Sequence, residues 1–579
     1  MGKFLIGLVS GIVLSILVAF IAVFVLLRFA ASFGEKAPTI SDGSTLVFSL
    51  EGEIPEKAPP EIPLPMFEDQ APVTMHQVWQ TFRKAAADPH IKAIMFEPRS
   101  LAVGWGKLEE IRGEMLQFRK SGKPLIAFLR GGGAKEYYLA TAADRIYMTP
   151  EDLLDLKGLR VEAMFLKNTL DKVGVHADVV HAGKYKDAGD ILTQTSMTPE
   201  TQEVLNAILD QYYGDLVQVI ADGRKKTPDQ VRSIIDNGPF MASDAQQNGL
   251  VDALAFDDQV AGDLQKRLGQ NELKKVPIRS YLKVPASSLN LEGGQRIALI
   301  VGEGEITRGS PTDNPNDQSG FTSTAFEKLL RTVENDSTIK AAVIRIDSPG
   351  GDGIASDDIL HEAQLLSHKK PVVISMGDVA ASGGYFVAMT GDPIVAYPNT
   401  LTGSIGVITA KFDLKGLYDK VGVQKQLLTR GQYADLDSDY EPLTGKNRDK
   451  ITQEVTAFYD QFKDRVAKGR KKPIDQVETL AQGRVWTGQE AKQNGLIDEL
   501  GGIDTAIDLA KKRANIGAGE KVTLVVYPPR QTIFDRLFSH SDDNAAVESK
   551  ISKLLGGFPV KSLTHGGFLK LMPYTIRVY

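Results

Sequence analysis

Residues 338–346 read TIKAAVIRI and residues 90–98 read HIKAIMFEP, so a short apolar segment occurs twice in this chain of 579 residues. A second pair, AQQNGLVD at 245–252 and AKQNGLID at 491–498, keeps the same order and nearly the same separation. Similarity that holds its order over so long a stretch is typical of duplicated domains. The sequence therefore predicts two homologous domains.

The two predicted domains span residues 45–275 and 295–525, and a segment rich in Pro and Ser joins them. In each domain, short β-branched runs such as AAVIRI and PVVISM alternate with amphipathic stretches such as SDDILHEAQLL. Strands that alternate with helices indicate an α/β fold with parallel sheets. We expect residues 308–320 to form a loop. Residues 530–579 form a tail outside the repeat, suited to a membrane surface, a neighbouring subunit or ordinary packing.

The longest apolar run lies at the N-terminus, where residues 4–27 carry no charge. As a helix rising 1.5 Å per residue, this run would be about 36 Å long, enough to cross a hydrocarbon core of about 30 Å with tilt. A cleavable signal peptide has a shorter apolar core. We therefore predict a transmembrane signal anchor, with a cleaved leader as the alternative. Lys3 on one side and Arg28 and Lys36 on the other leave its orientation open.

The composition excludes several functions. The net charge is −6, from 67 basic and 73 acidic residues, and no basic stripe is present, so a nucleic-acid partner is not expected. The chain contains no cysteine, which excludes disulfides, thiolate catalysis and zinc–sulfur sites.

The stretch GDVAASGGYFVAMTG at 377–391 contains a candidate nucleophile, Ser382. A strand is expected to end just before it and an apolar helix to begin after it, which would place the serine near backbone N–H groups that favour negative charge. The alternative is an ordinary N-cap serine. The segment DSPGG at 347–351 also follows a predicted strand, and its N–H groups suit either an oxyanion hole or a simple turn. Both segments should meet at one edge of the sheet.

Three motifs in this order, DSPGG, AASGGYF (380–386) and LTGSIGV (401–407), resemble the signal peptide peptidase A family, also called protease IV. This is a membrane-anchored serine protease family, distantly related to Clp protease and the crotonase fold. The resemblance covers almost the whole chain and matches the long, two-domain form of the family. It implies a tandem repeat of two Clp/crotonase-like domains, a Ser–Lys dyad, and no metal or cofactor.

The base that would activate Ser382 is not near it in the sequence. His361, three residues after Asp358 on a predicted helix, is one candidate because the pair could mimic part of a Ser-His-Asp triad. A lysine is the other, provided that burial lowers its pKa from about 10.4 towards 7–8. The base of the family lies in a G-x-Y-K segment, here GKYK at 183–186, and the resemblance assigns that role to Lys186.

The duplication offers an independent check on this assignment. At an offset of 248 residues, Lys186 corresponds to Ala434 and Ser382 corresponds to Ala134. The first domain would therefore keep the lysine and the second the serine, so that together they make one dyad, within one chain or between chains. Lys184 is a rival base because it lies two residues from Lys186.

The resemblance also implies the remaining site residues. Ser404, in the TGSIG segment, would orient the lysine through its hydroxyl. The backbone N–H groups of Gly383 and Gly351 would form the oxyanion hole, by analogy with Clp protease. The expected reaction is acyl transfer, in which Ser382 attacks the scissile carbonyl while Lys186 takes its proton.

The family further implies cleaved signal peptides and other hydrophobic peptides as substrates. It implies a bowl-shaped homo-oligomer, a tetramer, held in the cytoplasmic (inner) membrane by the N-terminal helix with its catalytic body on the periplasmic side. Two alternatives stay open at this point. One is a crotonase-type acyl-CoA enzyme, which usually needs paired carboxylates near the glycine-rich loops, and the other is a degenerate peptidase that serves as a membrane scaffold.

Overall fold

The computed structural model describes most of the chain between residues 38 and 529. The described residues are 38–59, 71–309, 321–529 and 568–572, with single positions at 11, 15, 18 and 578. The predicted anchor at 4–27, the predicted loop at 308–320 and the tail at 530–579 lie mostly outside these residues, so they stay predictions. Within the described ranges, no helix is both long and apolar enough to cross a membrane.

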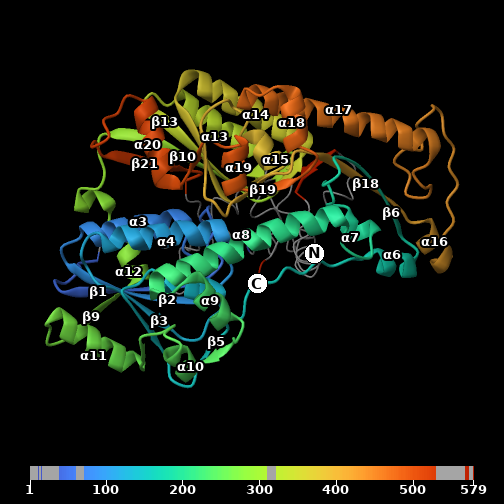
Figure 1. Cartoon of the computed structure of the whole chain (residues 1–579). Helices are drawn as coiled ribbons and strands as arrows, with labels where there is room; N and C mark the ends of the chain where they lie inside the picture. Colours follow the sequence, from blue (N-terminus) through green and yellow to red (C-terminus); the bar gives the residue numbers. More distant parts are fainter. Residues whose placement is uncertain are drawn as a thin grey trace.

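A six-stranded parallel sheet forms the core of the first half (Figure 1). Its strand order is β8-β4-β3-β2-β1-β9. The central strands are buried over most of their length because α3 and α4 cover one face and α11 covers the other. The strands are β1 (Ser44–Gly52), β2 (Ile91–Leu101), β3 (Leu125–Leu129), β4 (Arg145–Met148), β8 (Ala253–Leu254) and β9 (Lys274–Pro277), and the helices are α3 (Met75–Ala87), α4 (Trp105–Arg119) and α11 (Asp257–Leu268).

The second half is built on a similar sheet, whose main path runs β19-β17-β15-β13-β10-β21. Its neighbours pair in parallel except β17 and β19, which are antiparallel. Helices α13 and α14 cover one face and α20 covers the other. The strands are β10 (Gln295–Glu303), β13 (Ile339–Ser348), β15 (Val372–Ala381), β17 (Leu401–Gly403), β19 (Val485–Thr487) and β21 (Val522–Tyr527), and the helices are α13 (Ser323–Asn335), α14 (Gly353–Lys369) and α20 (Ile503–Arg513).

The order of elements shows that the two halves are copies of one α/β unit. The series β1-α3-β2-α4-β3-α5 returns as β10-α13-β13-α14-β15-α15, apart from three short added strands. The short helices α5 (Ala134–Ala140) and α15 (Gly383–Val387) follow the third strand of each series. Each half also has a helix of 26 residues, α8 (Pro199–Arg224) and α17 (Gly445–Arg470).

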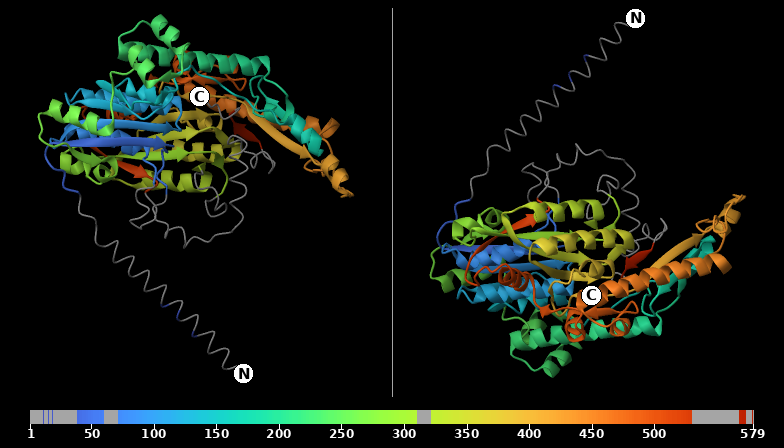
Figure 2. Two further views of the ribbon diagram at one scale, coloured as in Figure 1. Left: turned by 90° about the horizontal axis from the view of Figure 1, so that it is seen from below. Right: turned by 90° about the horizontal axis from the view of Figure 1, so that it is seen from above.

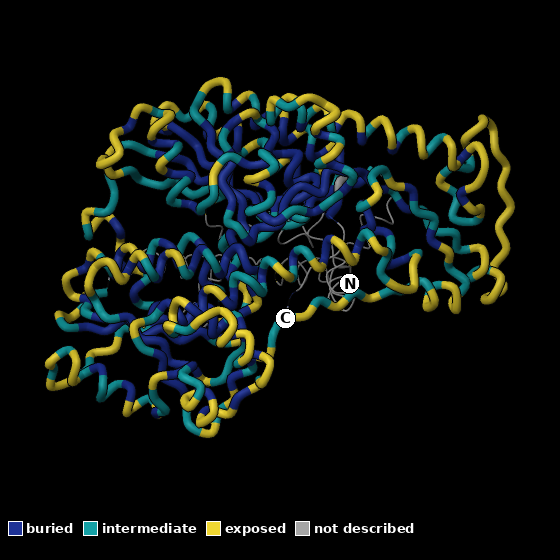
Figure 3. The backbone as a smooth tube through the Cα atoms, viewed as in Figure 1, coloured by how far each residue is buried: buried dark blue, intermediate teal, exposed yellow. Residues whose placement is uncertain are grey.

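A third sheet joins the two halves, and its order is β12-β11-β14-β22-β18-β6. All seven residues of β6 (His176–Ala182), from the first half, pair antiparallel with β18 (Val407–Asp413), from the second. These two strands extend away from the body towards α6 (Lys167–Val173) and α16 (Lys415–Val421), and we call this projection the arm (Figure 2). Figure 3 shows that buried residues gather in the two halves, whereas the arm is mostly intermediate or exposed.

The interior of this third sheet contains a strand from near the end of the sequence. β22 (Leu569–Leu571) lies between β14 (Gly350–Asp352) and β18, antiparallel to both. The remaining members, β11 (Ile306–Thr307) and β12 (Phe321–Thr322), each contain two residues. This sheet brings the DSPGG segment, the end of the chain and the first half to one place.

The segment between the two halves is packed rather than extended. It forms α12 (Ile278–Leu282) and a turn of 3-10 helix at Ala286–Leu289. The ammonium of Lys84, on α3, donates to the carbonyl oxygens of Tyr281, Leu282 and Val284 at 3.3, 3.3 and 2.8 Å. Pro and Ser marked the position of the junction, but they did not predict this packing.

Candidate active site

Ser382 lies at the sharp turn between β15 and α15, with φ of 53° and ψ of −114°. A positive φ is rare for a residue with a side chain and stores about 1–3 kcal/mol of strain. The backbone on both sides holds this conformation, since the N–H of Ser382 donates to Gly403 O at 2.8 Å and its carbonyl accepts from Phe386 N at 2.8 Å. The turn directs the hydroxyl to a lysine rather than to the first N–H groups of α15.

Lys186 reaches this hydroxyl from the other half of the same chain. Its Nζ lies 2.8 Å from Ser382 Oγ, 3.0 Å from Ser404 Oγ and 3.0 Å from the carbonyl oxygen of Ser404. All three residues are completely buried. The structure therefore brings together Ser382, Lys186 and Ser404, which the motifs selected.

The position of Lys186 follows from the third sheet. β6 ends four residues before the lysine, and its pairing with β18 places the following loop over the second half. There the N–H of Tyr185 donates to the carbonyl oxygen of Gln482 at 2.8 Å. The lysine is thus held by the backbone pairing of the segment directly before it.

Two glycines of the second half make room for the lysine. A Cβ on Gly483 would lie 2.6–2.7 Å from the backbone N, Cα and Cβ of Lys186, and Gly483 also has φ of +77°. A Cβ on Gly406 would lie 3.0 Å from Lys186 Cδ. Since neither position has space for a larger residue, the second half encloses the lysine and keeps it dry.

Burial decides the charge of this lysine. Removal from water lowers the pKa of Lys186 well below its ordinary value, and the neighbouring Asp187 opposes that shift only in part. Burial also raises the pKa of Asp187 to about 6, although the Thr201 hydroxyl donates a hydrogen bond to its carboxylate. The lowered pKa favours the neutral amine, which is the form of a lysine that can accept a proton.

The hydrogen bonds around Nζ also fix its orientation. The carbonyl oxygen of Ser404 can only accept, so it commits one N–H of the amine. The Ser404 hydroxyl can donate or accept, and so remains compatible with both charge states of the lysine. When the Ser404 hydroxyl accepts the second N–H of the neutral amine, the lone pair is left to receive the proton of Ser382.

The two predicted oxyanion glycines lie next to each other. Gly383 is the first residue of α15, and a Cβ placed on it would lie 3.1 Å from Gly351 N and 3.1 Å from Gly350 Cα. Gly351 belongs to β14 and has φ of +149°, a conformation that favours glycine. Its partner across the ladder is Lys570 of β22. The use of these N–H groups as an oxyanion hole stays a prediction.

β22 pairs with β14, the strand that begins at the two glycines of DSPGG. The N–H of Met572 donates to the carbonyl oxygen of Pro349 at 2.8 Å, and the N–H of Gly353 donates to the carbonyl oxygen of Phe568 at 3.0 Å. Leu571 and Met572 are buried. The edge of β14 therefore already accepts an extended segment with buried apolar side chains.

The rival bases lie apart from the serine. Lys184 is exposed, and its ammonium lies 4.5 Å from the centre of the Tyr185 ring. His361 is an exposed residue of α14. The two positions that correspond to the dyad are also separate, because Ala134 begins α5 in the first half and Ala434 is exposed in the second.

Sequence reasoning missed two residues that shape this site. Asp187 modulates the lysine, and its only signal was that it directly follows GKYK. Gly483, in the second half, leaves the space that Lys186 of the first half occupies, and nothing near Gly483 in the sequence indicates that contact. Both act through Lys186 rather than on the serine.

Two copies of one α/β unit, sharing a buried serine–lysine pair at the end of parallel strands, define a serine hydrolase. The sequence profile described as peptidase family S49 matches residues 117–271 and 364–517, one stretch in each half. The chain belongs to this family and is a serine protease.

Known relatives cover most of the chain. Identity to the chloroplastic serine protease SPPA of Arabidopsis thaliana is 39% over 504 residues, which is 86% of this chain and 73% of that protein. Identity to Protease 4 of Haemophilus influenzae is 29% over 532 residues, which is 86% of this chain and 84% of that protein. Among solved structures, a ClpP1 mutant from Listeria monocytogenes matches 36% of this chain and 94% of its own at 16% identity, and its TM-score of 0.23 is too low to support an argument.

Proposed function

We propose that this chain is a membrane-anchored serine endopeptidase in which Ser382 is the nucleophile and Lys186 is the general base. The observation that carries the proposal is the 2.8 Å hydrogen bond between Lys186 Nζ and Ser382 Oγ in a fully buried site. A serine hydroxyl is a weak nucleophile until a base removes its proton. A lysine whose pKa is depressed by burial is suited to that task.

The reaction proceeds in two stages. Ser382 Oγ bonds to the scissile carbonyl carbon as Lys186 takes its proton, and the N–H groups of Gly383 and Gly351 stabilise the oxyanion. Lys186 then protonates the leaving amine, and the C–N bond breaks to leave an acyl-enzyme. In the second stage Lys186 takes a proton from water, the hydroxide displaces Ser382, and the proton returns to the serine.

The substrates in this proposal are extended hydrophobic peptides, including cleaved signal peptides. The strand that occupies the edge of β14 supports this choice, because two of the three residues of β22, Leu569 and Leu571, are apolar and buried there. An extended peptide that pairs with the same edge would place its backbone beside Ser382.

The cellular setting is part of the same proposal. Residues 4–27 anchor the protein in the cytoplasmic (inner) membrane, with the catalytic body on the periplasmic side. The arm supports assembly into a homo-oligomer, a tetramer, because it exposes apolar side chains such as Val421 and Leu428, which are 64% and 95% exposed.

The test is turnover of a fluorogenic hydrophobic peptide by the full chain in detergent. Ser382→Ala and Lys186→Ala should each lower kcat by at least about 10³-fold, because the nucleophile and its base act as a unit. Lys184→Ala and His361→Ala are matched controls that should retain wild-type turnover. Activity that persists in Lys186→Ala would contradict the dyad, and an intact assembly without peptidase activity would favour the scaffold.

A further inference from the structure

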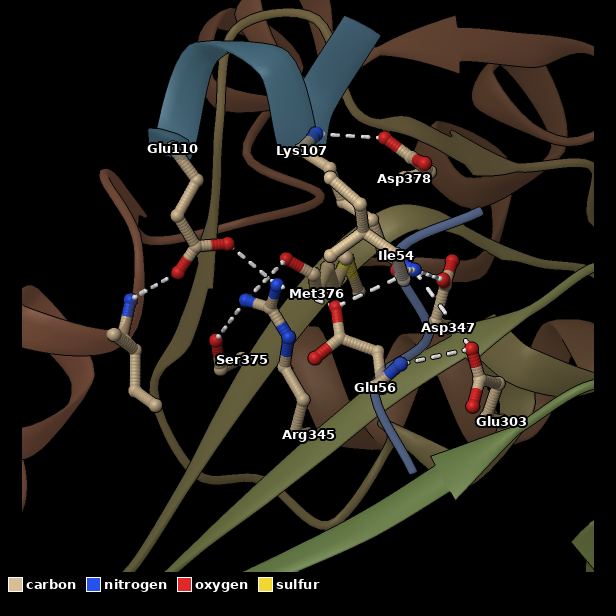
Figure 4. Close-up of polar contacts among 12 residues, drawn as sticks. Ile54, Glu56, Lys107, Glu110, Glu303, Arg345, Asp347, Ser375, Met376 and Asp378 are labelled. Atoms are coloured by element: carbon tan, nitrogen blue, oxygen red, sulfur yellow. Dashed lines mark hydrogen bonds and ion pairs between the residues drawn. The ribbon is translucent and has the colours of Figure 1, made fainter. Parts of the chain in front are cut away.

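The N-terminus of α4 is capped by the other half of the molecule. The N-cap residue of this helix is Gly104, which has no side chain to bond the first free N–H groups. Asp378, from the second half, accepts hydrogen bonds from Gly104 N and Lys107 N at 2.7 Å each. Figure 4 shows the bond between Asp378 and Lys107. Asp378 lies four residues before Ser382. A helix of the first half is therefore fastened to the turn that carries the nucleophile.

The corresponding helix of the second half is capped in the ordinary way. α14 begins after Asp352, whose own carboxylate accepts from Ile354 N and Ala355 N at 2.9 and 2.8 Å. Gly104 occupies the position of Asp352 in the first half. Its φ of −79° suits any residue, but a Cβ there would lie 2.4 Å from Asp378 Cγ. The glycine thus leaves the space that the distant carboxylate fills.

Lys107, in the first turn of α4, contacts Asp347 near the end of β13. Its Nζ lies 2.6 Å from Asp347 Oδ2 and donates to the carbonyl oxygen of Ile54 at 3.1 Å. The other oxygen of Asp347 accepts from Val379 N at 3.0 Å. Asp347 lies near the end of β13 and opens the DSPGG segment, so Lys107 is linked to the strand that leads into this segment and, through Asp347, to β15, which leads to the nucleophile (Figure 4).

These contacts hold an irregular part of the sheet. Ile346 of β13 pairs with Met376 of β15, but the next pair is Ser348 with Ala380. Residues 377–379 therefore bulge out of the ladder directly before the nucleophile turn. Ladder hydrogen bonds do not fix a bulge, and Asp347 and Asp378 supply bonds to it instead.

The contact between Lys107 and Asp347 joins two opposite charges. Burial lowers the pKa of Lys107, but the nearby carboxylates, Asp347 first among them, outweigh burial and raise it, so the ammonium stays charged. Removing one partner would leave a buried charge unpaired, which is costly.

The first half, which has Ala134 at the position of Ser382, lacks the corresponding contact between a lysine and two aspartates. At an offset of 248 residues, Asp347 corresponds to Arg99, Asp378 to Arg130 and Lys107 to Ala355. The charged contact is therefore present only beside the turn that contains the serine.

We infer that Asp378 and Lys107 are positioning residues for the nucleophile turn, so that the first half contributes to the reaction through the docking of α4 as well as through Lys186. This inference rests on the proposed function. The alternative is that Asp378 serves only to cap and stabilise α4.

A second substitution that restores the cap of α4 separates the positioning role of Asp378 from its capping role in the full chain. Asp378→Ala should lower both the melting temperature and kcat, the latter about 10- to 100-fold, because small displacements of a reacting group are that costly. KM for the fluorogenic peptide should change less than about threefold, since a misplaced nucleophile weakens the transition state more than ground-state binding. Adding Gly104→Asp to Asp378→Ala restores a cap from within the helix, as Asp352 does in α14. The melting temperature should then recover while kcat stays low.

Recovery of kcat together with the melting temperature in the double variant would overturn the inference. Thr227→Ala is the matched control, because Thr227 caps α9 (Pro228–Ile235) by accepting from Gln230 N at 3.2 Å. It should lose stability and keep kcat, and an equal loss of kcat there would also overturn the inference. If Asp378→Ala does not fold, Asp378→Asn keeps the shape and one acceptor and should still lower kcat. Wild-type turnover in Asp378→Asn would count against positioning, whereas turnover in Ser382→Ala would instead refute the proposed function.

Discussion

The turn after the third strand differs between the two copies of the domain. In the second half it holds Ser382, and the second residue after it is Gly384, where a Cβ would lie 2.7 Å from the carbonyl oxygen of Ser348. In the first half the corresponding residues are Ala134 and Glu136. The Glu136 carboxylate accepts from Leu101 N at 2.6 Å and from Gly133 N at 2.8 Å. The silent turn thus uses its own carboxylate to satisfy nearby N–H groups.

In the proposed mechanism, this difference divides the catalytic residues between the two copies. The first half has no serine at this turn and bonds its N–H groups with Glu136, but it supplies Lys186 from the loop after β6. The second half kept the strained serine turn and leaves the position of Lys186 to Ala434, an exposed residue.

The most severe test of this comparison moves the nucleophile to the silent copy. Ala134→Ser in a Ser382→Ala background should show no turnover of the fluorogenic peptide, a loss of at least about 10³-fold. The new serine would have no lysine opposite it, because Lys186 lies at the other turn. Measurable turnover in this variant would mean that the first half retains an active site of its own.

A substitution at the seat of the lysine should have the next largest effect. Gly483→Ala places a methyl group within 2.7 Å of Lys186 and forces a side chain onto a residue with φ of +77°. We expect kcat to fall about 10- to 100-fold, because the amine moves away from Ser382. Gly214→Ala, in the middle of α8 with open space around it, is the control. It should keep kcat and gain up to about 1 kcal/mol of stability.

The burial of Lys186 should also lower the free energy of unfolding, by an amount that depends on pH. The pKa of Lys186 is lower in the folded than in the unfolded chain, so between those two pKa values the unfolded state binds more protons. The free energy of unfolding of the wild type should then rise with pH across that window. Lys186→Met should be inactive yet melt higher than the wild type at pH 7, and the gap should narrow towards pH 10. A gap that is constant with pH would mean that the lysine is charged in the folded protein.

The smallest effect on activity is expected from the carboxylate in the silent turn. Glu136→Ala should leave kcat within about twofold of the wild type while the melting temperature falls. Two backbone N–H groups lose their acceptor, which costs about 1–3 kcal/mol when a buried donor is left unsatisfied. A large loss of turnover would show that the silent turn still takes part in the reaction.

Periodicity and self-comparison predicted the local parts of this structure better than its junctions. AAVIRI and PVVISM lie in central strands of the second sheet, and strands alternate with helices in both halves as expected. The pairing of β6 with β18 was not predicted, because alternating apolar residues indicate a strand but do not name its partner. Residues 176–182 and 407–413 are too far apart in the chain for a turn to signal their pairing.

The site shows the same limit. The approach of Lys186 to Ser382 was expected from family motifs and from the alanines at the corresponding positions, not from any local pattern. The cap of α4 left no signal at all, since its acceptor lies 274 residues away and the capped residue is a glycine. Contacts of this kind depend on how the two halves meet, which no single segment encodes.

β22 occupies the edge of β14 at which the proposed peptide substrate would pair. In the proposed function, a peptide that pairs with the edge of β14 must replace β22, a strand of the same chain that competes at an effective concentration set by the intervening residues. The apparent affinity for a peptide would then be the intrinsic affinity multiplied by the fraction of time that the edge is open. A peptide that forms fewer backbone bonds than β22 would lose this competition, and a longer extended one would win it. Selection by length would follow without any pocket that measures it.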